Sequence, residues 1–351
     1  MKVTKKLKDV FNLDVPDTVP IEVEDQPPQT TPKPLKGYFF NKETIKRLLL
    51  WINGIAGPSI ILTGPTGCGK SSVIEQFCAR LGIGVYRVPC HGRMEFQELI
   101  GGFRLADEVK RAEDEGKPLA KIGKWEALIV ALKNLSGIGP KMIWIDGPVI
   151  RAMREGCVVL LDEFNFLHPT VFGGLNSILD AASFVVPETG EIITAQAGFR
   201  VAMTGNGVDG GADAVLYRGI SKVNIAGLDR PCGIRVGYNA ATEEAQIIVA
   251  AHPTMNPTIV EVMVNVADDV RGLFKSGQCE TVISTRKLVQ WAALISARPW
   301  KDASPADILE LMKKTLDFAL LDVRPPHEQE AVHKALESRF RVSGVKAAAK
   351  P

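Results

Sequence analysis

A glycine-rich stretch between two apolar segments carries the residues with the clearest chemistry. It starts at Gly64 and ends at Ser71, with Lys70 directly before the serine, and it fills the spacing G-x-x-x-x-G-K-[ST]. Glycines let successive backbone N–H groups turn toward one anion, while the lysine and the serine hydroxyl suit phosphate oxygens and Mg²⁺. The spacing predicts a P-loop that binds a nucleoside triphosphate. The expected binding residues are Gly64, Pro65, Thr66, Gly67, Cys68, Gly69, Lys70, Ser71 and Ser72.

Two acids follow a second apolar run. Residues 157–161 are all apolar, and Asp162 and Glu163 come directly after them. Such a run suits a strand buried on both faces, whose acids emerge at its carboxyl end, where α/β sheets bind ligands. We expect Asp162 to hold Mg²⁺, largely through water and together with Ser71. Glu163 is expected to orient and polarise the attacking water. The pattern is that of a Walker B strand.

A third apolar run ends in an amide. The run starts at Phe199 and is followed by Asn206. An asparagine at a strand end is by itself more typical of a turn. Because this strand follows the Walker B strand along the chain, we expect Asn206 to lie beside Asp162 and Glu163. There it could hold the lytic water or the γ-phosphate.

The elements around these residues must place them at one edge of a sheet. Strands are expected at residues 59–62, 85–88, 142–145 and 157–161, with a helix between the first two that starts near Ser72. Asn41 is a predicted N-cap of an earlier helix. A short helix is expected at 149–155 and a β-hairpin between 184 and 194. The order predicts an α/β fold with a parallel sheet covered on both faces.

Composition divides the chain further. Residues 1–14 alternate basic and apolar side chains, which suits a short amphipathic helix or docking segment, and the proline-rich residues 15–36 predict an extended linker. The folded body is expected to start near Gly37. A large domain is predicted at 37–240 with an insertion at about 103–141, followed by a helical domain at 241–341 and a flexible tail at 342–351.

Overall composition leaves the partner open. The chain has 351 residues, 46% hydrophobic content and a net charge of +2, which gives no strong electrostatic reason for nucleic acid or an anionic membrane. Six cysteines without a C-x-x-C pair argue against a zinc site or a disulfide framework. No signal peptide or membrane-spanning run is evident. We expect a cytoplasmic protein that does not enter the membrane.

The order of these features resembles that of the AAA+ ATPases and, within them, the MoxR group. More narrowly, the chain is similar to the ATPase subunit of aerobic cobaltochelatase, and the similarity extends from about residue 7 to 340. Besides the motifs above, the similarity rests on residues 10–13, 38–44, 147–148, 216–219, 224 and 228–230. The P-loop and the Walker B strand are specific for the superfamily, and the other features are less so.

The resemblance implies ATP as the nucleotide, Mg²⁺ as its metal, a helical lid and a homo-oligomeric ring, usually a hexamer. Arg230 matches the Asp-Arg box and is the candidate arginine finger for the neighbouring subunit's site, with Arg218 as the alternative. Arg286 lies in a segment that matches sensor 2, which implies a contact to the γ-phosphate from the lid. Pro231-Cys232 after the box and the long insertion depart from the chelatase subunit and leave the partner in doubt.

The function predicted from these features is a Mg²⁺-dependent ATPase that remodels or activates a protein partner. The resemblance implies a partner with a von Willebrand A domain, and a metal chelatase is one such assembly. The alternative is a nucleic-acid remodeller whose pore residues come from 93–103 and from the hairpin near Glu188 and Glu191, although this hairpin is acidic. A scaffold that does not hydrolyse ATP is disfavoured because every catalytic element is present.

Overall fold

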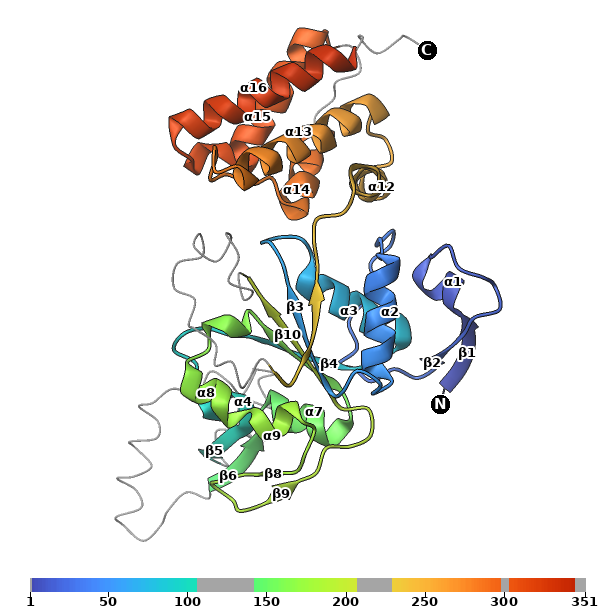
Figure 1. Cartoon of the computed structure of the whole chain (residues 1–351), viewed down its shortest axis with the longest axis vertical. Coiled ribbons are helices and arrows are strands. Elements are labelled where there is room, and N and C mark those ends of the chain that lie inside the picture. The colour runs from blue at the N-terminus through green and yellow to red at the C-terminus, as the bar shows by residue number, and fades with distance from the viewer. Residues whose placement is uncertain (1, 106–141, 207–228, 298–302, 345–351) are drawn as a thin grey trace.

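The structure is a computed structural model that describes residues 2–105, 142–206, 229–297 and 303–344. Figure 1 shows a sheet flanked by helices, with a bundle of C-terminal helices at one end of the molecule. The chain enters this bundle directly from one strand of the sheet, β11 (Cys232–Arg235). The predicted α/β fold with a helical C-terminal region is confirmed.

A five-stranded sheet lies at the centre of the α/β part, in the order β11, β3, β10, β7, β4. All four strand pairs are parallel, as predicted. The P-loop follows β3 and Asp162 ends β7, so both motifs lie at the carboxyl edge of the sheet, with β10 between them. The other bounds are β3 (Ser59–Thr63), β4 (Val85–Pro89), β7 (Val158–Asp162) and β10 (Arg200–Gly205).

Alternate residues of the strands enter two different cores. On β3, Ile60 packs in a cluster with Phe77, whereas the next residue, Ile61, belongs to a cluster with Met153. This alternation follows from the two-residue period of a strand. The apolar runs seen in the sequence are therefore strands that helices cover on both faces. The covering helices are α2 (Lys42–Ile52) and α3 (Lys70–Leu81) on one face and α7 (Pro148–Glu155) on the other.

Residues 15–36 differ from their prediction as an extended linker because they contain a strand, whereas a short helix lies within residues 1–14, where one was expected. β1 (Lys2–Lys6) pairs antiparallel with β2 (Pro20–Glu24), and α1 (Leu7–Phe11) follows β1. Phe11 is 1% exposed and stacks on Phe77 of α3, with the ring centroids 5.5 Å apart. Pro20 is the first residue of its strand, a position where proline is tolerated, so the proline content did not exclude a strand. The folded body therefore includes residues ahead of Gly37.

Besides β1 and β2, two further antiparallel strand pairs of the described residues lie outside the central sheet. The strand expected at 142–145 is present, but it pairs antiparallel with the segment that follows α4 instead of joining the parallel sheet. The hairpin predicted between 184 and 194 is also present. Residues 106–141 of the predicted insertion lie outside the described residues. The bounds here are α4 (Phe96–Ile100), β5 (Gly101–Leu105), β6 (Met142–Asp146), η2 (Phe164–Phe166), α8 (Pro169–Gly174), α9 (Asn176–Leu179), β8 (Phe184–Val185) and β9 (Ile192–Ile193).

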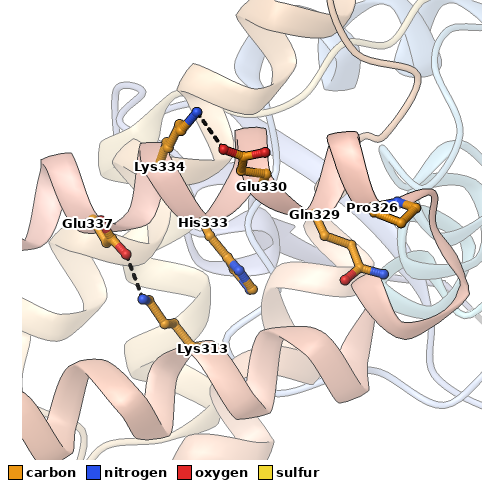
Figure 2. A pocket seen from close by; sticks show the side chains of 7 residues that line it. All are labelled: Lys313, Pro326, Gln329, Glu330, His333, Lys334 and Glu337. Atoms are coloured by element: carbon orange, nitrogen blue, oxygen red, sulfur yellow. Dashed lines mark hydrogen bonds and ion pairs between the residues drawn. The ribbon is translucent and has the colours of Figure 1, made fainter.

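Helices α12 to α16 form a bundle, called the lid below, with a core of its own around Trp291. Polar side chains join neighbouring helices of the lid: Lys313 of α15 bonds Glu337 of α16 at 2.6 Å. Figure 2 shows this pair among the residues that line a pocket, most of them on α16. Helices able to span a lipid bilayer are absent from the described part of the chain. The bounds are α12 (Ala241–Ala251), α13 (Pro257–Lys275), α14 (Thr285–Ser296), α15 (Pro305–Ala319), η3 (Leu321–Val323) and α16 (Pro326–Ser343).

Candidate nucleotide site

The P-loop has the backbone shape that its glycines predict. Gly64, Gly67 and Gly69 have φ angles of +150°, +72° and +94°, which side chains rarely permit. A Cβ atom on Gly64 would lie 1.9 Å from the carbonyl oxygen of Val236, so no other residue fits there. Gly69 is also the N-cap of α3, and a helix N-terminus favours an anion. The loop is therefore a cradle that fits phosphate groups.

Lys70 lies where a phosphate-binding lysine is expected. Its side chain is buried, and its ammonium donates to the Asn206 side-chain oxygen at 2.5 Å and to the carbonyls of Pro65 and Gly64 at 2.8 and 3.0 Å. Burial lowers the pKa of Lys70, and the nearby carboxylates of Asp162 and Glu163 oppose that shift. The lysine thus joins the P-loop to the polar end of β10.

Asp162 is the centre of a hydrogen-bond network at the end of β7. Its Oδ1 accepts bonds from the Ser71 hydroxyl and, at 2.5 Å, from the Thr204 hydroxyl. Its Oδ2 accepts two bonds from Arg87, at 2.5 and 3.1 Å. Burial by itself raises the pKa of Asp162, but these hydrogen bonds outweigh it and hold the pKa below its ordinary value. The group is therefore kept as a carboxylate.

The donor set around Asp162 fits Mg²⁺. The Ser71 hydroxyl and the Asp162 carboxylate share a hydrogen bond, so one small cation can reach both oxygens. Mg²⁺ is bound in nucleotide sites by one or two protein oxygens together with phosphates and water. No group of three or more metal-ligating His, Cys, Asp or Glu residues occurs in the described ranges. The residues present thus suit a metal that arrives with a nucleotide.

Glu163 has an unusual backbone conformation. Its φ and ψ are 57° and 41°, in the left-handed region that non-glycine residues rarely adopt. Its amide donates to the Thr204 hydroxyl at 3.1 Å, and its side chain is exposed. Such strain is concentrated at functional sites because the surrounding structure must impose it. Glu163 is thus an exposed carboxylate directly next to the buried carboxylate of Asp162.

Asn206 and Asn165 form a buried pair of amides next to the lysine. Asn206 is 7% exposed, and its backbone oxygen accepts a bond from Asn165 Nδ2 at 3.4 Å. Asn165 is fully buried, and its Oδ1 has no hydrogen-bond partner among the described residues. A buried orphaned acceptor is normally satisfied by water. Sequence reasoning found Asn206 but missed Asn165, which follows the two acids closely and could have been noticed as a polar residue there.

Arg87 is the main residue that sequence reasoning did not find. It lies on β4 and donates to Asp162 and to Glu75 of α3, at 3.1 Å for the latter. β4 pairs with β7 so that Pro89 is opposite Asp162. The one available signal was an arginine inside an otherwise apolar strand. Its partner could not be read from the sequence, because the two strands are far apart along the chain.

Arg286 lies against the P-loop, whereas Arg230 does not. A Cβ atom on Gly67 would lie 3.8 Å from Cβ of Arg286, and the charge of Arg286 contributes to lowering the pKa of Lys70. Arg230 precedes β11, at the edge of the sheet opposite the P-loop, and donates to Asp180 at 3.1 Å. The structure therefore brings Arg286 to the site of its own chain and keeps Arg230 away from it. Arg218 lies outside the described residues.

A cavity of about 440 Å³ is lined in part by Tyr238, whose hydroxyl bonds the P-loop. It lies between the start of α2 and the segment that joins β11 to α12. Asn41, the N-cap of α2, and Arg47 line it on one side, and Tyr238 lines it from the joining segment. The Tyr238 hydroxyl also donates to the backbone oxygen of Thr66 in the P-loop at 2.7 Å. The cavity is thus placed beside the phosphate cradle, with room for a nucleoside.

Comparison with known protein families decides the assignment. The family model "AAA domain (dynein-related subfamily)" matches residues 59–135 and 129–218, which include the P-loop, the Walker B strand and Asn206. The model "CbbQ/NirQ/NorQ C-terminal" matches residues 244–310 of the lid, including Arg286. The chain belongs to the MoxR group of AAA+ ATPases. The two matches explain why a P-loop sheet and this helical lid occur together.

Relatives of this MoxR-group protein include uncharacterized proteins of staphylococci. One from Staphylococcus haemolyticus is 28% identical over 284 residues, which cover 80% of this chain and 90% of the relative. One from Staphylococcus aureus is 27% identical over 284 residues, with the same coverage. A solved structure from Cytophaga hutchinsonii named as an ATPase covers 86% of this chain and 88% of its own, with 15% identity and a TM-score of 0.42. A TM-score this low adds nothing to the assignment.

The narrower similarity of this MoxR-group protein to the cobaltochelatase subunit stays a prediction. Some of the residues that carry it are placed: 10–13 lie in and after α1, and 38–44 lead into α2. The residues at 216–219 and 224 lie outside the described ranges. The helix at Gly147-Pro148 is present as α7, with the glycine as its N-cap.

Proposed function

We propose that the protein is a Mg²⁺-dependent ATPase that works as a homo-oligomeric ring, most simply a hexamer, and uses ATP hydrolysis to remodel or activate a protein partner. One observation carries this proposal. Lys70 from the P-loop, Asp162 from β7 and Asn206 from β10 meet at the carboxyl edge of three adjacent strands. A lysine, a metal-binding acid and a polar amide in this arrangement suit phosphoryl transfer to water.

The proposed roles follow from position. The P-loop amides and Lys70 hold the β- and γ-phosphates, and the cavity bounded by Asn41, Arg47 and Tyr238 takes the nucleoside. Ser71 and Asp162 hold Mg²⁺, which when bound neutralises charge on the phosphates. Glu163 projects from its strained turn and orients the attacking water, with Asn206 as a second polar contact. Arg286 approaches the γ-phosphate from the lid. Catalysis then consists mainly of positioning and charge stabilisation.

The ring is supported by the location of Arg230. It lies at the sheet edge opposite its own P-loop, so it can serve only a site on another molecule. An arginine supplied by a neighbouring subunit stabilises the charge of the transferred phosphoryl group. Head-to-tail contacts of this kind generate closed rings when the rotation between subunits closes. Members of this family commonly form such oligomers, and we propose the same here.

The proposed partner is a protein with a von Willebrand A domain, as the MoxR resemblance implies, and a metal-chelatase assembly is one form that this pairing takes. Nucleic acid is disfavoured as the substrate because the hairpin β8–β9 bears Glu188 and Glu191, whose charge opposes a phosphate backbone. Arg154, a basic residue next to this hairpin, is already paired with Asp146 and Glu191, each at 2.8 Å.

Glu163→Gln tests the proposed activity. We expect ATP turnover to fall by about 10²-fold or more, because a general base contributes that much, while ATP binding is retained. Glu261→Gln is a matched control, since Glu261 is exposed on α13 in the lid. Turnover by Glu163→Gln at the wild-type rate would show that another group activates the water. Absence of Mg²⁺-dependent ATP hydrolysis by the wild-type protein would refute the ATPase itself.

The same variant tests the partner. A ring that binds ATP without hydrolysing it should retain its substrate, so affinity purification of Glu163→Gln from its host should enrich the partner relative to Glu261→Gln. We expect a protein with a von Willebrand A domain. Stimulation of the wild-type ATPase by DNA, weakening as salt is raised, would instead favour the nucleic-acid alternative.

A further inference from the structure

The segment between the sheet and the lid is bonded to the P-loop at several points. This segment, residues 236–240, is called the hinge segment below. The backbone N–H of Val236 donates to the oxygen of Thr63 at 2.8 Å, and the Cys68 thiol donates to the oxygen of Val236 at 3.4 Å. The Tyr238 hydroxyl donates to the oxygen of Thr66 at 2.7 Å. A shift of the P-loop backbone would therefore displace the hinge segment directly.

The ring of Tyr238 carries the contact onward into the lid. The guanidinium carbon of Arg271, on α13, lies 4.0 Å from the centre of this ring. A guanidinium on an aromatic face at this distance is attracted by the ring and packs flat against it. Tyr238 thus touches the P-loop with its hydroxyl and the lid with its ring.

Arg271 is fixed by a buried ion pair. Its two terminal nitrogens donate to the two carboxylate oxygens of Glu244, at 2.8 and 2.9 Å, and the side chains are 5% and 0% exposed. Its Nε donates to the backbone oxygen of Ile283 at 2.9 Å. A buried pair with this bidentate geometry holds both partners in one arrangement. It also joins α12 to α13 and to the residues just before α14.

The network ends beside Arg286. The Thr285 hydroxyl donates to Glu244 at 2.5 Å, and Thr285 is the first residue of α14. Together with the Arg271 bond to Ile283, this contact holds the start of α14 from both sides. The next residue is Arg286, which lies over Gly67 of the P-loop. A continuous set of contacts therefore leads from Thr66 through Tyr238, Arg271, Glu244 and Thr285 to the start of the helix that carries Arg286.

We propose that Tyr238 is a positioning residue that couples the P-loop to the lid, so that nucleotide in the P-loop sets the position of Arg286 through Arg271 and Glu244. This inference rests on the proposed nucleotide site. Two features distinguish it from ordinary packing. The hydroxyl donates to a backbone oxygen of the phosphate-binding loop. The ring packs against Arg271, whose buried ion pair with Glu244 holds the start of α14, the helix that carries Arg286.

Tyr238→Phe separates these two contacts. The variant keeps the ring on Arg271 and removes the hydroxyl that bonds Thr66, so the lid should fold with an unchanged thermal midpoint. We expect ATP affinity to weaken by about threefold to tenfold, as the loss of one neutral hydrogen bond predicts. In hydrogen exchange, ATP should protect residues 283–288 in the wild-type protein and protect them less in the variant. Tyr86→Phe is the matched control, because Tyr86 donates to Glu155 at 2.7 Å on β4, outside the network.

A double-mutant cycle decides whether the effect passes through Arg286. If it does, Tyr238→Phe should weaken ATP binding much less in an Arg286→Ala background than in the wild-type background. Equal losses in the two backgrounds would show that Tyr238 acts only on the P-loop and would overturn the proposal. Wild-type behaviour of Tyr238→Phe in affinity and in exchange would overturn it too. Failure of the wild-type protein to bind ATP would instead refute the nucleotide site on which the inference rests.

Discussion

Arg87 on β4 and Asp162 at the end of β7 are joined by two hydrogen bonds to one carboxylate oxygen, Oδ2, at 2.5 and 3.1 Å. The other oxygen of Asp162 accepts bonds from Ser71 and Thr204. The carboxylate is thus held on one side by an arginine and on the other by the hydroxyl that we assign to Mg²⁺. This relationship makes Arg87 a positioning residue for the metal acid.

Arg87→Ala should lower ATP turnover by about 10-fold to 100-fold, because hydrogen bonds to a charged group contribute about 1.5 to 3 kcal/mol and their loss frees the carboxylate to rotate. The turnover of Arg87→Lys should lie between that of Arg87→Ala and that of the wild type, since lysine retains the positive charge but cannot donate two hydrogen bonds as the planar guanidinium does. Steady-state hydrolysis at several Mg²⁺ concentrations measures both. Arg154→Ala, which removes an exposed arginine paired with Asp146 and Glu191, is the control and should leave turnover unchanged. Full activity of Arg87→Ala would exclude the positioning role.

Gly64→Ala should abolish nucleotide binding and lower stability. The new Cβ would lie 1.9 Å from the backbone oxygen of Val236, and that atom cannot move away as a flexible side chain could. Gly173→Ala is the control, because Gly173 is exposed in α8 with no atom within 4 Å of its Cβ position. Fluorescent-nucleotide binding and thermal melting report the two effects. Normal binding by Gly64→Ala would mean that the hinge segment is not closely packed on the P-loop.

The sequence was sufficient to predict the centre of the site. An apolar run that ends in polar residues marks a buried strand and its functional end, and this pattern led to Asp162 and Asn206 without knowledge of the strand order. The P-loop was equally clear, because its backbone shape requires glycine at fixed positions. These predictions depend on short-range pattern, which the strand and helix periods preserve.

The partners of these residues depend on contacts between distant parts of the chain. Arg87 meets Asp162 only because β4 is placed beside β7, and Tyr238 reaches Thr66 only because β11 pairs with β3. Neither placement follows from local pattern. Residues 15–36 show the opposite error, since their prolines suggested a linker although β2 pairs with β1 and Val23 is buried. Composition indicated low structure there, and a few apolar residues outweighed it.

Phe11→Ala tests whether the N-terminal segment belongs to the folded body. Phe11 packs edge-on against Phe40, with centroids 5.1 Å apart, and stacks on Phe77 at 5.5 Å. We expect a loss of about 3 to 5 kcal/mol in the free energy of unfolding, the usual cost of truncating a buried phenylalanine. Phe318→Ala is the control because Phe318 is 73% exposed in the lid. Denaturant unfolding measures the difference, and equal stability of the two variants would show that the N-terminal segment does not belong to the folded body.

Arg230 should act in the active site of a neighbouring subunit, and subunit mixing tests this directly. Arg230→Ala and Lys70→Ala should each lower ATP turnover by about 10³-fold or more. The first variant lacks the arginine finger, and the second lacks the phosphate-binding lysine. In a mixed ring, some sites are intact. In these sites an Arg230→Ala subunit binds ATP with its own Lys70, and a neighbouring Lys70→Ala subunit supplies Arg230. With random head-to-tail assembly at equal amounts, roughly one site in four has this composition, so the mixture should recover activity that neither variant has. Size-exclusion chromatography must show that both variants still assemble. A mixture of assembled rings that stays as inactive as its components would place Arg230 outside the neighbouring site and leave it as a structural partner of Asp180.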